Sequence, residues 1–251
     1  MQLPKRLLPY FENAAYRTDD IGRSGSQVLI MPDKVLKIEK EGAESDNEHA
    51  MYAWLQGKLP VPRVYESFRE AGFNYLLMDR VAGRMACDAR EMQTPELAVR
   101  LLAEGLRLLW AVDIRDCPAD QRLSRKLARA GERLEEGLVD AEDTEPDTLT
   151  RFASMQALYR HLTQSRPPED AVFSHGDYCL PNVFFDGGKV SGFVDLGRSG
   201  VADRWQDVAL CVRSLAYNFG TDRYRDVLLS ELGLPCDEEK IDYYILLDEF
   251  F

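Results

Sequence analysis

The stretch SHGDYCLPNVFFDGGKVSGFVDLGR, residues 174–198, constrains the fold of this chain more than any other part of it. Two short apolar runs in it are separated by a glycine turn and predict two short buried strands. Asp177, Asn182 and Asp195 lie at the ends of these runs. Asp and Asn are favoured in turns, so turn chemistry is one explanation. The other explanation is that their side-chain oxygens form a site for a metal ion and a nucleotide.

Composition and charge restrict the class of protein. The chain has 251 residues, which is enough for one large domain or two lobes with a substantial core. Its 45% hydrophobic and 29% charged residues are typical of a globular protein. The formal net charge of −12 argues against a nucleic acid or an anionic membrane as partner, because both require basic patches. An acidic protein suits a cationic small molecule.

The cysteines and the amino-terminal segment indicate the compartment. The five cysteines are odd in number, widely separated and without a C-x-x-C pair, which favours free thiols in a reducing compartment. The beginning, MQLPKRLLPYFENAAY, is too interrupted for a signal peptide, and no long apolar stretch follows. We therefore expect a cytoplasmic protein without a membrane partner, present as a monomer or weak dimer.

Periodicity divides the chain into a β-rich first third and a helical remainder. Short β-branched or aromatic runs between residues 15 and 79 predict a sheet, with one helix inserted at AESDNEHAMYAWLQGKL. Gly83, in the bridge MDRVAGRMA, could serve as a flexible joint. This layout predicts the α+β, two-lobed protein-kinase-like fold, with an amino-terminal nucleotide-binding lobe at 1–82 and a carboxy-terminal catalytic lobe at 83–251.

Helical patterns dominate from Thr94 onward, where Thr94 is a plausible N-cap with proline following. Further helical patterns cover residues 121–138 and 150–164, and three more follow the 174–198 stretch. The acidic stretch DAEDTEPD, residues 140–147, predicts a loop between two of the helices, and a plain solvated loop is one interpretation of it.

The residue types in the 174–198 stretch match the requirements of phosphoryl transfer. That reaction needs metal-binding oxygens, a group that orients the attacking hydroxyl, and a cation on the nucleotide phosphates. Asn182 and Asp195 can supply oxygens for Mg²⁺, and Asp177 can accept the hydroxyl proton. A D-x-x-x-x-N spacing and an aspartate after an apolar strand also occur in protein kinases. His175 is expected to be a structural hydrogen-bonding residue.

Lys37 and Glu48 predict the cationic part of the same site. Lys37 lies in the apolar strand KVLKIEK, where an ammonium requires a partner, and Glu48 on the following helix can provide one. An edge-strand lysine facing solvent is the alternative. Ser24, in GRSGSQ, lies where a phosphate-covering loop would be, although a plain hairpin turn explains that segment equally well.

Four motifs together resemble one known family. HGDYCLPN, GFVDLGRSGVADRWQDVAL, WLQGKLPVPRV and the final YYILLDEFF are similar to the aminoglycoside 3′-phosphotransferases, or kanamycin kinases, over residues 22–251. The resemblance implies ATP and Mg²⁺, transfer of the γ-phosphate to the 3′-hydroxyl of kanamycin- or neomycin-type antibiotics, and antibiotic resistance.

The resemblance also implies roles for individual residues. It makes Asp177 the catalytic base. It assigns the other groups as follows: Asn182 and Asp195 to magnesium; Lys37, Glu48 and Ser24 to the phosphates; Met78 and Val81 to adenine at the hinge; and Arg198, Glu145, Asp147, Glu249 and Phe251 to the antibiotic.

Three positions depart from the family pattern, and alternatives stay open. Val35 replaces an aromatic ring against adenine, and Tyr217 and Asn218 replace acids of the drug pocket. These departures leave two other functions in consideration: a kinase of another small alcohol, and a nucleotide- or drug-binding module without turnover. Arg198 has an alternative role as the ion-pair partner of Asp203 or Asp207.

Overall fold

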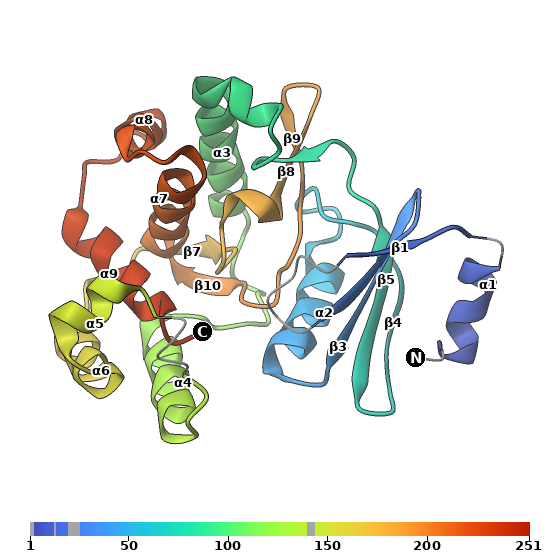
Figure 1. The fold of residues 1–251 in the computed structure, drawn as a ribbon, viewed down its shortest axis with the longest axis horizontal. Helices are drawn as coiled ribbons and strands as arrows, with labels where there is room; N and C mark the ends of the chain where they lie inside the picture. The colour runs from blue at the N-terminus through green and yellow to red at the C-terminus, as the bar shows by residue number, and fades with distance from the viewer. Residues whose placement is uncertain (1–2, 13, 20–25, 140–143) are drawn as a thin grey trace.

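The computed structural model describes residues 3–12, 14–19, 26–139 and 144–251, and it has two lobes (Figure 1). The amino-terminal lobe is a five-stranded antiparallel sheet in the order β1-β2-β3-β5-β4. Helix α2 lies on the side of the sheet that faces the second lobe (Figure 1). The bounds of these elements are β1 Arg17–Asp19, β2 Gln27–Ile30, β3 Lys34–Lys40, α2 Ala43–Leu55, β4 Val64–Glu70 and β5 Phe73–Asp79.

Strand β3 shows why a lysine lies inside this sheet. Successive side chains of a strand point to opposite faces. Leu36 and Ile38 are buried in a small core on the outer face, together with Leu7 of the amino-terminal segment. That segment forms a 3-10 helix, Lys5–Leu7, and the short helix α1, Leu8–Phe11, which the sequence patterns did not predict. Lys37 therefore points to the inner face, toward α2.

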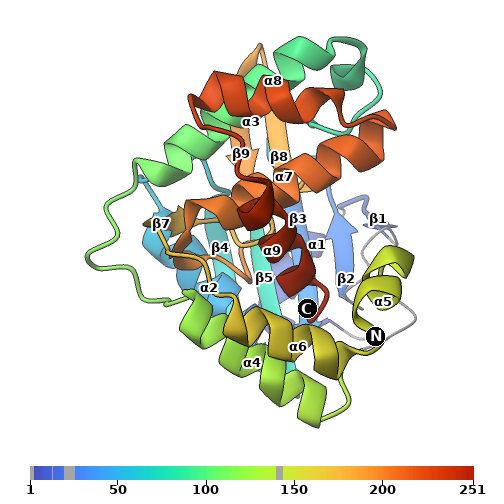
Figure 2. The ribbon, with the colours of Figure 1, turned by 90° about the vertical axis from the view of Figure 1, so that its left-hand side faces the viewer.

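The carboxy-terminal lobe is mainly helical and contains two small sheets, with α9 packed against α7 and α6 (Figure 2). The hairpin β8–β9 pairs with β6, and β7 pairs with β10. The bounds of the strands are β6 Arg84–Met85, β7 Ala171–Ser174, β8 Val183–Asp186, β9 Lys189–Phe193 and β10 Gly200–Asp203. The bounds of the helices are α3 Pro95–Trp110, α4 Leu123–Glu135, α5 Pro146–Phe152, α6 Met155–Gln164, α7 Arg204–Phe219, α8 Arg223–Leu232 and α9 Glu238–Asp248, with 3-10 turns at Glu91–Gln93 and Leu180–Asn182.

The predicted α+β class with a β-rich first lobe and a helical second lobe is confirmed, and two local predictions are wrong. The pattern over 150–164 predicts one helix, but α5 ends at Phe152 and α6 begins at Met155. Ala153 is left-handed, with φ 56°, and the Ser154 side chain caps α6. Helix α5 also includes the last two residues of the predicted loop 140–147. Thr94 is the N-cap residue of α3, with proline following as predicted, but its side chain makes no cap hydrogen bond.

Gly83 lies where the chain passes from the first lobe to the second. Its φ is +86°, and a Cβ atom there would lie 1.9 Å from the carbonyl oxygen of Phe185 on β8. Only glycine permits both this backbone conformation and this approach.

Within the described residues, no helix has the length and apolar character needed to cross a membrane.

Candidate active site

Lys37 is the centre of an ion-pair cluster between the two lobes. Its Nζ lies 2.7 Å from Glu48 Oε2 on α2, and 3.0 Å from Asp195 Oδ1, which follows β9. Glu39 Oε1, on the same strand as Lys37, lies 3.1 Å away. Glu48 uses its other oxygen to accept a hydrogen bond from the Leu196 backbone N–H, at 3.2 Å. Residues from β3, α2 and the segment after β9 are thus joined through a single ammonium group.

Charge attraction keeps Lys37 and Asp195 ionised. Burial by itself would lower the pKa of Lys37, but the carboxylates of Glu48, Asp195 and Glu39 outweigh it and raise that pKa well above its ordinary value. The partial burial of Asp195 would raise its pKa, but attraction to Lys37 holds it below the ordinary value. Burial raises the pKa of Glu48, and Lys37 limits that rise. Asp195 is therefore an anion at neutral pH.

The loop after β7 brings Asp177 and Asn182 together. The Asn182 side-chain amide donates to the Asp177 backbone carbonyl and to its Oδ2, both at 3.0 Å. The backbone carbonyl of Asn182 accepts a hydrogen bond from the Val194 N–H at 3.1 Å, and Val194 immediately precedes Asp195. A continuous path of bonds thus connects four of the predicted site residues, Asp177, Asn182, Asp195 and Lys37.

Asp207 holds this loop in place, and the sequence analysis did not find it. This carboxylate on α7 is fully buried and accepts hydrogen bonds from Ser174 Oγ at 3.0 Å, His175 N at 2.8 Å and Gly176 N at 2.9 Å. Burial raises its pKa, and these bonds oppose the rise. A signal was present: an aspartate preceding the apolar run VALCV must find partners inside the protein.

His175 is fully buried, and its Nε2 lies 3.0 Å from the Val194 carbonyl oxygen. This contact ties the loop after β7 to the segment that leads into Asp195. The geometry supports the structural role expected for this histidine.

The two hinge predictions fall on the connection between the lobes. Met78 is buried on β5, opposite Val35 of β3, and Val81 lies against Gly192 of β9. The Ser191 hydroxyl donates to the Ala82 carbonyl at 2.7 Å, which fixes the connection to the β8–β9 hairpin. Ser24 lies outside the described residues.

Arg198 has a different partner from those considered in the sequence. It pairs with Asp248 at the end of α9, and Arg213 of α7 pairs with the other oxygen of that carboxylate. Burial would raise the pKa of Asp248, but the two guanidinium groups lower it to about 2. Asp203 and Asp207 bind other groups, so the suggested pairing of Arg198 with either is wrong.

The predicted antibiotic-binding acids are only partly brought together. Glu249 Oε2 accepts from the Glu145 backbone N–H at 3.3 Å, and its Oε1 accepts from Thr148 Oγ1 at 3.1 Å. Glu249 and Glu145 are therefore neighbours, and burial raises the pKa of Glu249. Asp147 is exposed in the first turn of α5.

Phe251 lies among basic side chains instead of acids. Its ring has the guanidinium carbon of Arg198 at 5.2 Å, and those of Arg129 and Arg133 at 5.5 and 5.9 Å. The buried Lys126 Nζ lies 5.5 Å from the same ring. We call these four basic side chains around Phe251 the basic cluster, in which burial and the nearby Arg198 lower the pKa of Lys126 to about 7. Asp248 pairs with Arg198 and Glu44 pairs with Arg129, so both signs of charge occur around Phe251.

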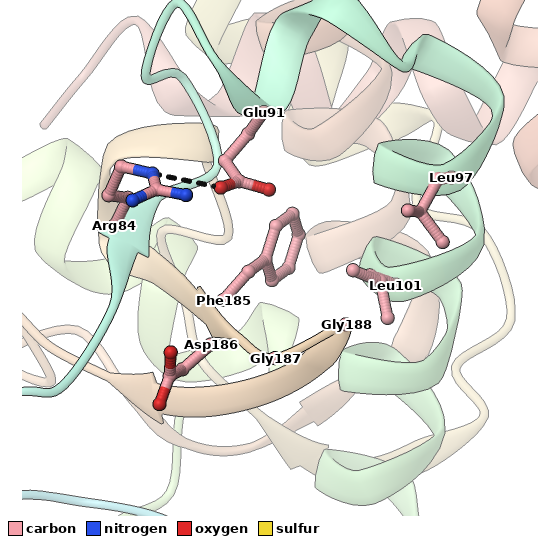
Figure 3. A pocket seen from close by; sticks show the side chains of 8 residues that line it. All are labelled: Arg84, Glu91, Leu97, Leu101, Phe185, Asp186, Gly187 and Gly188. Atoms are coloured by element: carbon pink, nitrogen blue, oxygen red, sulfur yellow. Dashed lines mark hydrogen bonds and ion pairs between the residues drawn. The ribbon is translucent and has the colours of Figure 1, made fainter.

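Two cavities lie next to the connection between the lobes. One, of about 240 Å³, is lined by Pro32 and by Arg80, Val81, Ala82 and Gly83, so it borders the predicted hinge. The other, of about 230 Å³, lies between β8 and α3 (Figure 3). Its lining includes the ion pair Arg84–Glu91, at 3.1 Å, but none of the predicted site residues.

Comparison with known proteins adds an independent line of support. The model of the phosphotransferase enzyme family matches residues 15–242. The chain is 46% identical to an aminoglycoside 3′-phosphotransferase of Niallia circulans over 79% of this chain and 76% of that protein. It is 42% identical to one of Enterococcus faecalis, over 92% and 87%.

A solved structure gives the same result at the level of the fold. The crystal structure of an aminoglycoside-3′-phosphotransferase of type VIII superposes with a TM-score of 0.83 at 31% identity, covering 98% of this chain and 97% of that one. Both the sequence and the fold thus agree over nearly the whole chain. The chain belongs to the aminoglycoside 3′-phosphotransferase family.

Proposed function

We propose that the protein transfers the γ-phosphate of ATP to the 3′-hydroxyl of an aminoglycoside antibiotic of the kanamycin or neomycin type, and so confers resistance. The observation that carries the proposal is the bonded path that joins Lys37, Asp195, Asn182 and Asp177 across the two lobes. These are the groups that phosphoryl transfer requires, and family membership indicates the acceptor.

Lys37 is the proposed partner of the ATP phosphates. An ammonium held by Glu48 is kept charged and correctly oriented for the α- and β-phosphate oxygens. Adenine is proposed to lie against Met78 and the backbone at Val81, with Ser24 near the phosphates. The lobe boundary is proposed at residues 82 and 83, where the close approach of Gly83 to Phe185 supports it.

Asn182 and Asp195 are the proposed ligands of Mg²⁺. They offer an amide oxygen and an ionised carboxylate, the hard oxygens that Mg²⁺ prefers. No group of three or more His, Cys, Asp or Glu side chains within the described ranges could hold a metal ion alone. Two protein oxygens are nevertheless sufficient for Mg²⁺, because substrate phosphates and water complete its shell. When bound, Mg²⁺ would neutralise charge on the phosphates.

Asp177 is the proposed catalytic base. Its Oδ2 receives the Asn182 amide, which orients the carboxylate to accept the proton of the 3′-hydroxyl. The hydroxyl oxygen then attacks the γ-phosphorus, the bond to the β-phosphate oxygen breaks, and ADP leaves. Arg198, Glu145, Asp147, Glu249 and Phe251 are the proposed contacts of the antibiotic.

Assembly and location are proposed as well. A monomer or weak dimer is proposed as the active form, in which the contacts of Lys37 with Glu48 and of Asn182 with Asp177 lie within one chain. All five cysteines are free, which supports the reducing environment of the cytoplasm.

A second candidate is a kinase of a different small alcohol. Tyr217, at 83% exposure, and Asn218, whose amide donates to the Ser214 carbonyl at 2.8 Å, are neutral. Neither residue adds negative charge to the second lobe, which is therefore less suited to a polycation than acids at these two positions would make it.

One experiment separates these functions. Purified protein with ATP and Mg²⁺ is expected to release ADP when kanamycin or neomycin is added, but not with an analogue that lacks the 3′-hydroxyl. Asp177→Asn should lower kcat by a factor of about 10² to 10⁴, because the general base is lost while the shape is kept. Release of ADP with another alcohol alone would favour the second candidate. An Asp177→Asn variant with full turnover would contradict the assigned base.

A further inference from the structure

Helix α2 is bonded to the segment that follows Asp195 by a side chain without an assigned role. The amide nitrogen of Asn47 donates to the carbonyl oxygens of Gly197 at 2.9 Å and of Ser199 at 2.8 Å. These two carbonyls lie on either side of Arg198 in the sequence. The next residue of the helix, Glu48, binds the Leu196 N–H. Two adjacent residues of α2 thus hold one short stretch of backbone.

The backbone of the first lobe also approaches this stretch closely. A Cβ atom on Gly197 would lie 3.0 Å from the carbonyl oxygen of Glu44, at the start of α2. The Glu44 side chain pairs with Arg129 of α4 at 3.0 Å. The backbones of α2 and of residue 197 are therefore packed so closely that a shift of α2 would also move this segment of the second lobe.

An amide suits this location for a chemical reason. The NH₂ group of asparagine has two donors, so one side chain can satisfy two carbonyl oxygens. A carboxylate has no donor and would repel both carbonyls. Asn47 is half-buried, which limits competition from water for these bonds.

The segment held by Asn47 contains groups that the proposed reaction uses. Asp195 has φ 61°, a backbone conformation that is unfavourable for a residue with a side chain and persists only when its surroundings hold it. Arg198 follows three residues later. Lys37, on the other side, is held by Glu48 of the same helix. Helix α2 is thus the common support of the phosphate-binding and metal-binding groups.

We propose that Asn47 is a positioning residue for phosphoryl transfer, which rests on the function proposed above. It does not contact the reacting atoms. It holds Asp195 and Arg198 in register with Lys37 by fixing the backbone of residues 195–199 to α2.

Asn74 provides a matched control. It is buried on β5, and its amide nitrogen also makes two hydrogen bonds to the α2 region, to Ser45 Oγ at 2.7 Å and Asp46 Oδ1 at 2.9 Å. These bonds fix the opposite side of α2 to the sheet. Asn74→Ala and Asn47→Ala therefore remove the same chemical group, but only the second releases the segment after Asp195.

The experiment compares both variants with the unchanged protein. Binding of Mn²⁺, as a spectroscopic probe for the divalent ion, is measured by electron paramagnetic resonance in the presence of ADP and without an acceptor. Asn47→Ala is expected to weaken Mn²⁺ binding and to lower kcat by about 10- to 100-fold, the usual effect of losing an outer-shell partner. KM for kanamycin should change by less than kcat. Asn74→Ala should leave Mn²⁺ binding and kcat within about twofold, even where it lowers the melting temperature more.

The outcomes distinguish the two proposals. Equal effects of Asn47→Ala and Asn74→Ala, or normal Mn²⁺ binding in Asn47→Ala, would overturn the role of Asn47. If Asn47→Ala does not fold, Asn47→Gln decides the matter: it keeps both donors and should give Mn²⁺ affinity within tenfold of the unchanged protein, and a larger loss would count against the proposal. Absence of acceptor-dependent ADP release in the unchanged protein would refute the proposed function, while the Mn²⁺ measurement would still test Asn47.

Discussion

At the scale of single residues, the most informative side chains are those that support the reacting groups. Asp207 binds three consecutive residues before Asp177 with one carboxylate. Lys37 similarly gathers three carboxylates that belong to different elements. In both cases a buried charge is stable because every one of its close neighbours is a complementary group. The geometry of Asp177 and Asp195 follows from these contacts.

We predict that Asp207→Asn destabilises the fold by about 2 to 4 kcal/mol, because an NH₂ group would then face backbone donors inside the protein. The loop would shift, so kcat should fall while KM for ATP changes little. Urea unfolding and steady-state kinetics measure both effects.

Asp203→Asn is the control for this prediction. Asp203 is also buried near the start of α7, but it binds Tyr244 at 2.9 Å and the Asp170 N–H at 3.1 Å, away from the catalytic loop. The Asp203→Asn variant should have a lower free energy of unfolding and an unchanged kcat. If kcat falls equally in Asp207→Asn and Asp203→Asn, the loss results from general destabilisation and not from a shift of the loop after β7.

At the scale of elements, the close approach between the inter-lobe connection and β8 fixes the position of the hairpin β8–β9. Gly83 permits this approach, and the Ala82 carbonyl beside it receives a hydrogen bond from Ser191 of β9. The hairpin β8–β9 is thereby fixed on one side to the connection. On the other side it leads into Asp195. The hairpin β8–β9, which leads into the proposed metal ligand Asp195, is therefore fixed to the connection between the lobes.

We predict that Gly83→Ala destabilises the protein more than Gly220→Ala does. Both glycines have positive φ, +86° and +66°, but only Gly83 has a neighbour where the methyl group would lie. Gly220→Ala should cost about 1 kcal/mol, the penalty for a left-handed alanine. Gly83→Ala should cost about 1 to 3 kcal/mol more from overpacking, and KM for ATP should rise. Equal unfolding free energies for the two variants would contradict the contact with Phe185.

At the scale of the whole molecule, long-range and local charge act in opposite directions on a polycationic substrate. The formal net charge of −12 attracts such a substrate from solution. The basic cluster around Phe251 opposes its approach to one part of the second lobe, but only in part. Asp248 compensates the charge of Arg198, and Glu44 compensates the charge of Arg129.

We predict that KM for kanamycin rises several-fold when salt is increased from about 0.02 to 0.3 M, because the Debye length falls below about 10 Å above 0.1 M. Sucrose at equal osmolality is the control and should have no such effect. A KM that stays constant or falls with salt would mean that the basic cluster outweighs the net charge during capture.

The sequence by itself determined the class of fold, the positions of most strands and helices, and the residues of the Lys37 path. These features depend on local periodicity, on turn residues and on motif spacing, all of which act over a few neighbouring residues. The sequence pattern did not predict the break between α5 and α6, because helical spacing continues across Ala153 and Ser154. Only the cap of α6 interrupts it.

Only the tertiary structure decided the partners of several buried polar and charged groups. Arg198 had several acids as possible partners in the sequence, and the docking of α9 against α7 selected Asp248. The roles of Asp207 and Asn47, and the basic surroundings of Phe251, arise in the same way from segments far apart in the chain. For these groups the sequence carries no local signal of the partner, because the bond forms only after distant elements have packed together.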